Sequence, residues 1–428
     1  RKTDLSKVSS LEDDVKPQLA SPFFNAVLQN DTAVAQLGPA LLHFFTNVQG
    51  TDSYSRNSKR YHVAIILKNL WPSQPHRETL KRESHTDAEF SRFAMLLIND
   101  TVDFFDEGRE SLKKVIAYQA EVVGDAFSQL SEEEQQATNS SMRQERAHAR
   151  NSFHFANEAI NLFEILTSEI VKPFLEPELV QRVAYLLDFN LVDLIEVSTN
   201  EDETSKKLLK LYEEVALKPS DTILALIRVY LNVSQNHDSC EDSSSNTNSC
   251  EADSKTVTSD SGVARRISGT PLSINEFGSM NDEFINAVVN DGRSFKPTLF
   301  QKFVDIFKDT PPTTLINDVK AIETVSQRFI TLIAKFEQIA AQTAEAEEDL
   351  GEIPDDYLDP ILATLMINPV KLPASGMIVD RAMIRAHLLS DAIDPFNRAP
   401  LKIEDVIPQP KLQQEIEQWV CDQKNIAA

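Results

Sequence analysis

The chain has 428 residues, of which 41% are hydrophobic and 25% are charged, and its formal net charge is -24. This length predicts more than one folded unit, and the composition excludes a wholly disordered or fibrous protein. The negative charge disfavours nucleic acid as a partner, because its phosphate backbone would be repelled, and no apolar run approaches the roughly 20 residues that a membrane-spanning helix needs. We expect a protein of the cytoplasm and nucleus, without a membrane partner.

Apolar residues recur mostly at spacings of three and four, which predicts a mainly helical protein. The first helix is expected to begin at Pro22, because proline suits the first helical position. A longer helix is expected over residues 88–118, and Asn99 or Gly108 could interrupt it. Further helices are expected over residues 39–45, 61–70, 131–150, 151–170, 177–197, 206–215 and 219–233.

Helices that follow one another over residues 1–233, and again over 274–349, favour an elongated α-solenoid of the armadillo or HEAT type. A plain helical bundle is the alternative, because self-similarity demonstrates no repeat. In the second part, helices are expected over residues 274–289, 298–308 and 315–349.

Residues 234–262 are rich in Ser, Asn, Asp and Glu and have almost no apolar side chains, so we expect the acidic insert, residues 234–273, to be disordered. Cys240 and Cys250 lie inside it, but a tetrahedral metal site needs more ligands than the insert offers. We therefore expect no metal and no cofactor. The string RRIS resembles a site for a basophilic kinase, which makes Ser268 a candidate phosphorylation site that could alter the insert.

Residues 350–428 differ from the rest, because prolines and short apolar runs replace long helices. Residues 369–372 and 377–379 are expected to pair as a hairpin, across a turn that contains a glycine. Asp380 should cap a helix over residues 381–389. The unit is completed by a loop at 394–398, a return to the core at 401–407 and a closing helix at 411–421.

This order of elements, with the strings DDYLDPILATLMINPV, IVDRAMIRAHLL and DPFNRAPL, resembles the U-box family along its full length. The resemblance implies a small α+β domain, a RING-like fold without zinc, and the lack of zinc-ligand cysteines agrees with it. Buried polar contacts replace the metals in such domains, because a small domain otherwise lacks sufficient core. We expect Asp380, Arg381, Asp394 and Asn397 to belong to this network; the alternative for them is plain capping and turn formation.

By position, Ile361 in the first loop and Pro395 with Phe396 in the second match the family residues that contact a ubiquitin-conjugating enzyme. Arg398 matches the arginine that bridges this enzyme and ubiquitin, so that a lysine amine meets the thioester in a near-attack geometry. The resemblance implies that the catalytic cysteine is not in this chain. Alternatively, Arg398 merely pairs with a neighbouring acid such as Asp394.

The helical part is similar to ubiquitin conjugation factors of the E4 type, through ALLHFFTNVQGT, KRYHVAIILKNLW, FLEPELVQRVAYLLDFNL and NDGRSFKPTLF. Together the resemblances imply a ligase that elongates ubiquitin chains on ubiquitinated substrates for proteasomal degradation. They also imply binding to a hexameric AAA segregase and to ubiquitin-like shuttle proteins. The alternative is a non-catalytic helical scaffold with a degenerate U-box.

Overall fold

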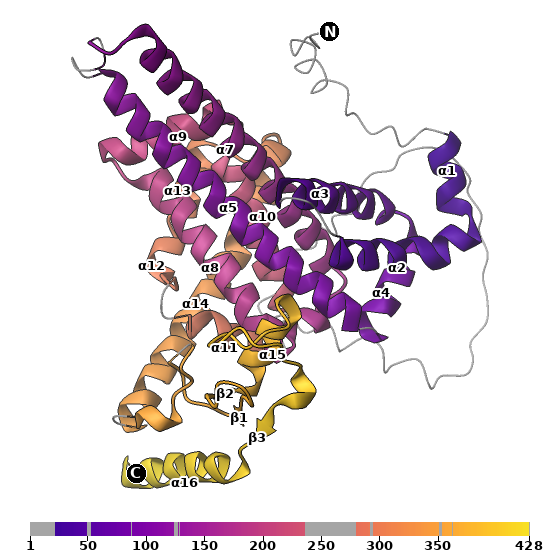
Figure 1. Cartoon of the computed structure of the whole chain (residues 1–428), viewed down its shortest axis with the longest axis vertical. Coiled ribbons are helices and arrows are strands. Elements are labelled where there is room, and N and C mark those ends of the chain that lie inside the picture. Colours follow the sequence, from indigo (N-terminus) through magenta and orange to yellow (C-terminus); the bar gives the residue numbers. More distant parts are fainter. Residues whose placement is uncertain are drawn as a thin grey trace.

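The computed structural model describes residues 22–48, 53–86, 88–123, 127, 129–235, 280–291, 294–350, 353–361 and 363–427. Long helices form most of it, and a small unit with a three-stranded sheet lies at the C-terminal end (Figure 1). The expected fold class, mainly α with a small α+β unit, is confirmed. The stacking of the helices as an armadillo or HEAT solenoid stays a prediction.

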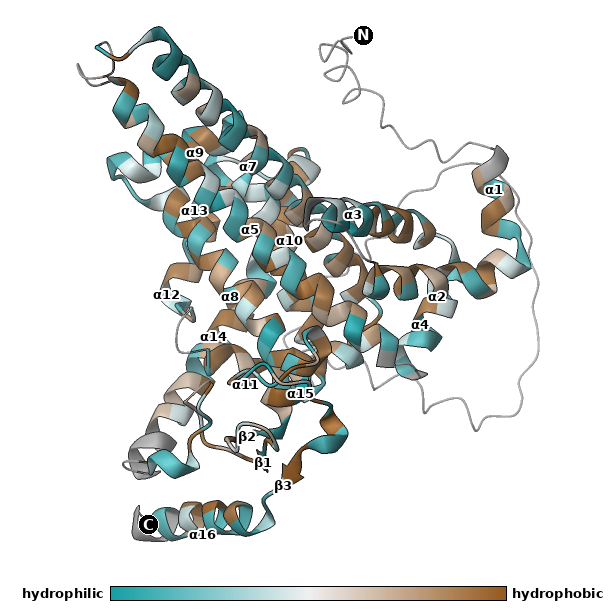
Figure 2. Cartoon of the chain, in the orientation of Figure 1, coloured by the Kyte–Doolittle hydropathy of each residue, from teal (hydrophilic) through white to brown (hydrophobic). Residues whose placement is uncertain are grey.

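Two long helices, α5 (Ala88–Val123) and α7 (Glu132–Thr167), pack along each other and form the centre of the helical part (Figure 1). α7 begins where Ser131 and Glu134 exchange hydrogen bonds between side chain and backbone, which is a capping box. Hydrophobic residues are concentrated where the helices face one another (Figure 2). Three further helices pack beside this pair: α8 (Pro177–Thr199), α9 (Glu203–Glu214) and α10 (Pro219–Val233).

The longer helix expected over residues 88–118 is confirmed by α5, and the alternative of a break at Asn99 or Gly108 does not occur. The expected division between residues 131–150 and 151–170 was wrong, because Glu132–Thr167 form one continuous helix. A Cβ at position 108 would lie 2.7 Å from the ring of Phe153 on α7. The glycine therefore permits the close approach of two helices and does not end one.

Replacing Gly108 by alanine should destabilise the helical part by up to about 2 kcal/mol, because the buried Phe153 ring would have to move into filled space, which costs about 1–3 kcal/mol. The roughly 1 kcal/mol that alanine gains over glycine within a helix offsets part of this cost. Gly38→Ala is the matched control, since its Cβ would meet only the side-chain end of Leu80, at 3.0 Å. Urea unfolding followed by circular dichroism should show the larger loss for Gly108→Ala. Equal midpoints for the two variants would contradict the steric explanation.

Four shorter helices precede this pair in the described part of the chain; α2 and α4 contact α5, α3 contacts α7, and α1 packs on α2 (Figure 1). α2 begins earlier than expected, because Asn30 caps it by accepting a hydrogen bond from the Ala33 amide at 2.9 Å, and Pro39 lies inside the helix. α4 was not foreseen, since its sequence is mostly polar although Leu80 is buried. The four helices are α1 (Pro22–Gln29), α2 (Asp31–Asn47), α3 (Ser53–Leu70) and α4 (Gln74–Thr86).

The helices before and after the acidic insert share one core. Gln235 pairs with Met280 in an antiparallel bridge, so the two ends of the insert lie side by side. Tyr230 on α10 lies within 5.3–6.2 Å of four phenylalanine rings from the later part, Phe284, Phe300, Phe329 and Phe336. The later helices are α11 (Asp282–Val289), α12 (Pro297–Phe300), α13 (Phe303–Asp309) and α14 (Val319–Leu350). Ser234 and Gln235, the first two residues of the insert that was predicted to be disordered, are ordered at the end of α10 and in the bridge. The rest of that prediction, residues 236–273, and the candidate site Ser268 fall outside the described residues.

The C-terminal unit is built on an antiparallel sheet with the strand order β2-β1-β3. β1 and β2 form the expected hairpin, with Val370 opposite Val379, and Gly376 in its turn has a φ of +73°. Asp380 caps the following helix, as expected, by accepting a hydrogen bond from the Ala382 amide. The elements are β1 (Pro369–Lys371), β2 (Ile378–Asp380), α15 (Arg381–Ser390), β3 (Ile407–Pro408) and α16 (Pro410–Ala427). The core of the unit is small: Val370, Leu372, Val379, Ile384, Leu401 and Val406.

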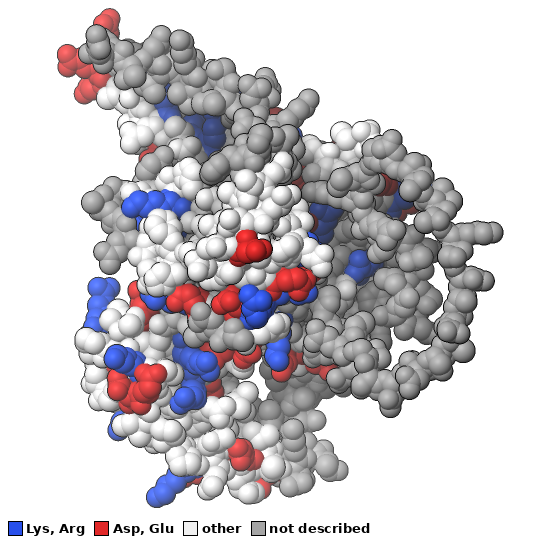
Figure 3. All heavy atoms as spheres, turned by 90° about the vertical axis from the view of Figure 1, so that its right-hand side faces the viewer, with Lys and Arg blue, Asp and Glu red and all other residues white. Residues whose placement is uncertain are grey.

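The described surface carries both signs of charge. On the face shown in Figure 3, Lys and Arg side chains lie among Asp and Glu side chains. Among the helices that the structure describes, none has a stretch apolar and long enough to span a membrane.

Candidate functional site

Two loops of the C-terminal unit have the same local structure, and each contains an Asp-Pro pair. The Asp359 carboxylate accepts a hydrogen bond from the Ile361 amide at 2.8 Å. In the second loop, Asp394 accepts one from the Phe396 amide at 2.9 Å. Both are Asx turns, in which an aspartate oxygen bonds the backbone two residues later. Each turn therefore fixes the backbone at an apolar residue that was predicted from the sequence to contact a partner, Ile361 in the first loop and Phe396 in the second.

The equivalence continues to the end of each loop. The carbonyl of Asp359 accepts a hydrogen bond from the Ala363 amide at 2.7 Å, and that of Asp394 accepts one from the Arg398 amide at 2.8 Å. Ala363 and Arg398 have φ values of 56° and 60°, in the left-handed region that non-glycine residues seldom adopt. One antiparallel bridge closes each loop at its base. Ala363 and Arg398 thus occupy the same position in the two loops.

The second oxygen of each carboxylate attaches its loop to the β1–β2 hairpin. Asp359 Oδ2 accepts a hydrogen bond from the Asp380 amide at 2.6 Å, and Asp394 Oδ2 accepts one from the Ser375 amide at 3.2 Å. The Asp380 carboxylate accepts two more from the backbone directly before β1. Ser375 and Asp380 are five residues apart, so the two attachment points lie within roughly 17 Å of each other.

Both loop aspartates are fully buried, and hydrogen bonds compensate for the burial of their charge. Burial alone would raise the pKa of Asp394, but bonds from Ser375, Phe396 and Asn397 outweigh it and hold the pKa below its ordinary value. The resulting stabilisation is present above the pKa of the unfolded state and is lost as the pH falls through the lower folded-state pKa. At neutral pH the ionised Asp394 carboxylate therefore accepts the hydrogen bonds that fix the second loop to the hairpin.

The two turns expose apolar side chains to solvent. Ile361 is 38% exposed and Phe396 is 42% exposed. Pro395 is half-buried, and Arg398 is exposed beside them in the second loop. Large apolar side chains held out on ordered turns are typical of a surface that binds another protein. We call these four residues the docking surface; their contact with a conjugating enzyme stays a prediction.

The structure places the four residues of the predicted polar network in three different situations. Asp380 and Asp394 are its central acceptors, as described above. Asn397 is exposed and accepts one local hydrogen bond, from the Ala399 amide at 2.9 Å. Arg381 takes part through its backbone amide, which donates to Asn368; its side chain is exposed and has no hydrogen bond or ion pair among the described residues. A side-chain role for Arg381 in a buried network is therefore not supported, because the guanidinium remains in solvent.

Asp359 is the member of the network that sequence reasoning missed. It is fully buried and joins the first loop to the start of α15 through the Asp380 amide. A signal for it was present, because Asp359-Pro360-Ile361 and Asp394-Pro395-Phe396 are the same pattern, Asp-Pro followed by an apolar residue.

The alternative in which Arg398 merely pairs with Asp394 finds no support in the geometry. The Asp394 oxygens accept hydrogen bonds from backbone amides. Within the described part of the chain, Arg398 has no ion pair at 4.0 Å or less. Its guanidinium is exposed and able to meet another molecule.

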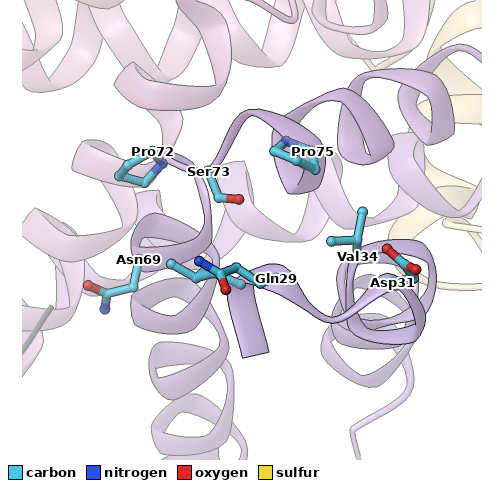
Figure 4. Close-up of a pocket in the computed structure, with 8 residues that line it drawn as sticks. Gln29, Asp31, Val34, Asn69, Pro72, Ser73 and Pro75 are labelled. Carbon is cyan, nitrogen blue, oxygen red and sulfur yellow. The ribbon is translucent and has the colours of Figure 1, made fainter. Parts of the chain in front are cut away.

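No other described feature competes with these loops as a chemical site. A cavity of about 500 Å³ lies among the N-terminal helices (Figure 4), and Asp31 is the one ionisable residue that lines it, so it contains no acid-base pair. The described residues contain no group of three or more His, Cys, Asp or Glu side chains that could hold a metal ion. Cys421 is exposed, and the other two cysteines fall outside the described residues.

Comparison with known proteins covers both parts of the chain. The family described as ubiquitin elongating factor core matches residues 5–329, and the U-box domain family matches residues 353–425. The first match ends within α14, which continues to Leu350. The second includes both loops and the whole sheet.

Three relatives agree with these matches. The E4 ubiquitin-protein ligase UFD2 of Saccharomyces cerevisiae is 32% identical over 389 residues, which cover 88% of this chain and 34% of that protein. The ubiquitin conjugation factor E4 of Schizosaccharomyces pombe is 28% identical over 411 residues, which cover 94% of this chain and 34% of that protein. The ubiquitin conjugation factor E4 A of Bos taurus is 26% identical over 424 residues, which cover 95% of this chain and 34% of that protein. The chain thus spans about a third of the length of these curated relatives. It belongs to the ubiquitin elongating factor core family, with a U-box domain over residues 353–425.

Proposed function

We propose that this chain is a U-box ubiquitin ligase that elongates ubiquitin chains. The U-box binds a ubiquitin-charged conjugating enzyme and promotes transfer of ubiquitin from the thioester to a lysine, on the substrate or on ubiquitin already attached to it. The chain forms no covalent intermediate with ubiquitin, because the thioester belongs to the conjugating enzyme. The observation that carries the proposal is the pair of equivalent Asx turns that hold Ile361 and Phe396 out to solvent.

The geometry suits this task in two ways. Ordered turns lose little conformational entropy when a partner binds, so their apolar side chains contribute more of their contact energy to affinity. Arg398 offers a planar fork of donors that can bond the conjugating enzyme and ubiquitin at once. When the thioester carbon and the attacking amine are held close together and aligned, the activation free energy of ubiquitin transfer falls by several kcal/mol, about 7 or more in favourable cases.

The wider role is also a proposal. The helical core would hold ubiquitinated substrates and bind an AAA segregase and ubiquitin-like shuttle proteins, in the cytoplasm and nucleus, in the service of proteasomal degradation. The names of the relatives, ubiquitin conjugation factors of the E4 type, support the part in ubiquitin conjugation. The segregase, the shuttle proteins and the compartments rest on the family resemblance alone.

A chain-growth assay tests the proposed function. The chain is mixed with activating enzyme, ATP, ubiquitin, a ubiquitin-fused substrate and, one at a time, a panel of conjugating enzymes. We expect ubiquitin chains to lengthen with at least one of them. If none supports growth while the chain still binds conjugating enzyme, the non-catalytic scaffold is the better description.

Ile361→Ala should weaken binding of the active conjugating enzyme by about tenfold, since loss of an apolar anchor at a docking surface costs about 1–2 kcal/mol. The matched control is Ile367→Ala, in the same domain and 74% exposed but outside the docking surface. Titration calorimetry gives both affinities, and chain growth should fall with the first variant alone. Equal losses for both would remove Ile361 from the contact.

A further inference from the structure

One helix of the U-box lies directly against the helical core. α15 contacts both α5 and α8, and Figure 1 shows it at their lower end. Ile384 is buried within the U-box, whereas Ala386, 5% exposed, belongs to the core cluster of the helical part. Leu389 packs against that same cluster. The U-box therefore has an attachment to the helical core that is separate from the chain connection after α14.

An ion pair lies at this junction. Arg385 Nη1 on α15 is 2.6 Å from Glu178 Oε1 on α8. Glu178 is the second residue of α8 and only 7% exposed, and no other basic side chain of the described residues lies within 4.0 Å of its carboxylate. A buried carboxylate needs hydrogen bonds or a charged partner, and the charged partner of Glu178 comes from the U-box. Such a pair favours one relative orientation over others, because displacement removes the ion-pair partner of a carboxylate that is only 7% exposed.

The remainder of the junction is not tightly filled. A cavity of about 250 Å³ lies between α15 and the two core helices. Its lining is largely polar and includes Asn99, Asp103, Arg182, Tyr185, His387 and Asp391. The U-box also contacts the helical part where α16 packs against α14, and among the contacts between the two parts the ion pair is the most directional.

The docking surface remains exposed while α15 lies on the core, since Ile361 and Phe396 are 38% and 42% exposed in this arrangement. The junction therefore does not cover the Ile361 or Phe396 side chain.

We infer that Arg385 and Glu178 are positioning residues, which hold the U-box so that the bound thioester faces the substrate on the helical core. The inference rests on the proposed function and concerns where ubiquitin is delivered, not whether the U-box activates transfer. Discharge of ubiquitin to free lysine needs no particular placement of the U-box. Extension of a ubiquitin-fused substrate held by the core does.

Arg385→Glu tests the inference, because the Arg385 side chain is 56% exposed and its replacement leaves the U-box core intact. We expect unchanged discharge to free lysine and about tenfold slower extension of the fused substrate. The double variant Arg385→Glu with Glu178→Arg should restore extension. Lys308→Glu is the matched control, an equal change of charge at an exposed ion pair with Asp305, and should alter neither rate.

Hydrogen-deuterium exchange of the same variants reports the junction directly. Amides of α15 should exchange faster in Arg385→Glu and return to the original rate in the double variant. Normal extension by Arg385→Glu, faster extension, or equal loss of both reactions would each overturn the inference. Failure of the original chain to discharge ubiquitin at all would instead refute the proposed function.

Discussion

Replacing Arg398 by alanine should slow ubiquitin discharge from the conjugating enzyme by about 10- to 100-fold, because charge-assisted hydrogen bonds made in the reacting complex are worth roughly 1.5–3 kcal/mol. Affinity for the conjugating enzyme should be unchanged, since Ile361 and Phe396 remain. The first loop shows that alanine is tolerated at this place: Ala363 occupies the equivalent position with nearly the same backbone angle. A slow variant is therefore not explained by a collapsed loop.

Discharge to free lysine in single-turnover conditions, with binding measured separately by calorimetry, checks this result. Arg398→Lys is the informative companion, because it keeps the charge but loses the planar fork and should recover only part of the rate. Unaltered discharge by Arg398→Ala would remove the bridging role.

Replacing Asp394 by alanine should reduce the stability of the U-box by about 2–3 kcal/mol or more, because two part-buried backbone amides lose their acceptor at roughly 1–3 kcal/mol each. That loss is a large part of the stability of a small domain. Trp419 reports it, since its ring lies 5.8 Å from that of Tyr357 within the U-box. Placing the change in a Trp71→Phe background leaves Trp419 as the one tryptophan, because the chain has two.

Asn397→Ala is the control for this experiment, since that side chain is exposed and accepts a single local hydrogen bond. It should cost about 1 kcal/mol or less. Asp394→Asn should lie between the two, because the amide keeps one acceptor oxygen. If Asp394→Ala and Asn397→Ala unfold at the same urea concentration, the carboxylate is not what holds the loop.

Features set by neighbouring residues could be predicted from the sequence. The α10 helix, Pro219–Val233, coincides with its prediction because proline marks the first helical position. The β1–β2 hairpin and the Asp380 cap could also be predicted, because each depends on a residue within the element itself: a glycine in the turn and an aspartate at the start of the helix. The resemblance of the C-terminal strings to the U-box family identified the exposed residues of the two loops by their positions.

Features set by distant residues could not be predicted. Continuity of α5 through Gly108 depends on the Phe153 ring of α7, which the local sequence does not reveal. The role of Asp359 depends on the amide of Asp380, across the hairpin, and the attachment of α15 depends on Glu178, much earlier in the sequence at the start of α8. Such contacts exist only once the helices have packed.

The carboxylates that close the two U-box loops have a consequence for how the domain comes to exist in a cell. A RING domain folds around bound zinc, so its folded fraction rises and falls with the free metal by mass action. Asp359 and Asp394 are instead part of the polypeptide, and the groups they bind are too. Folding is then a unimolecular event without a ligand concentration in its equilibrium constant. The hydrogen bonds that hold the docking surface in place therefore join groups of one polypeptide and take up no ligand from solution.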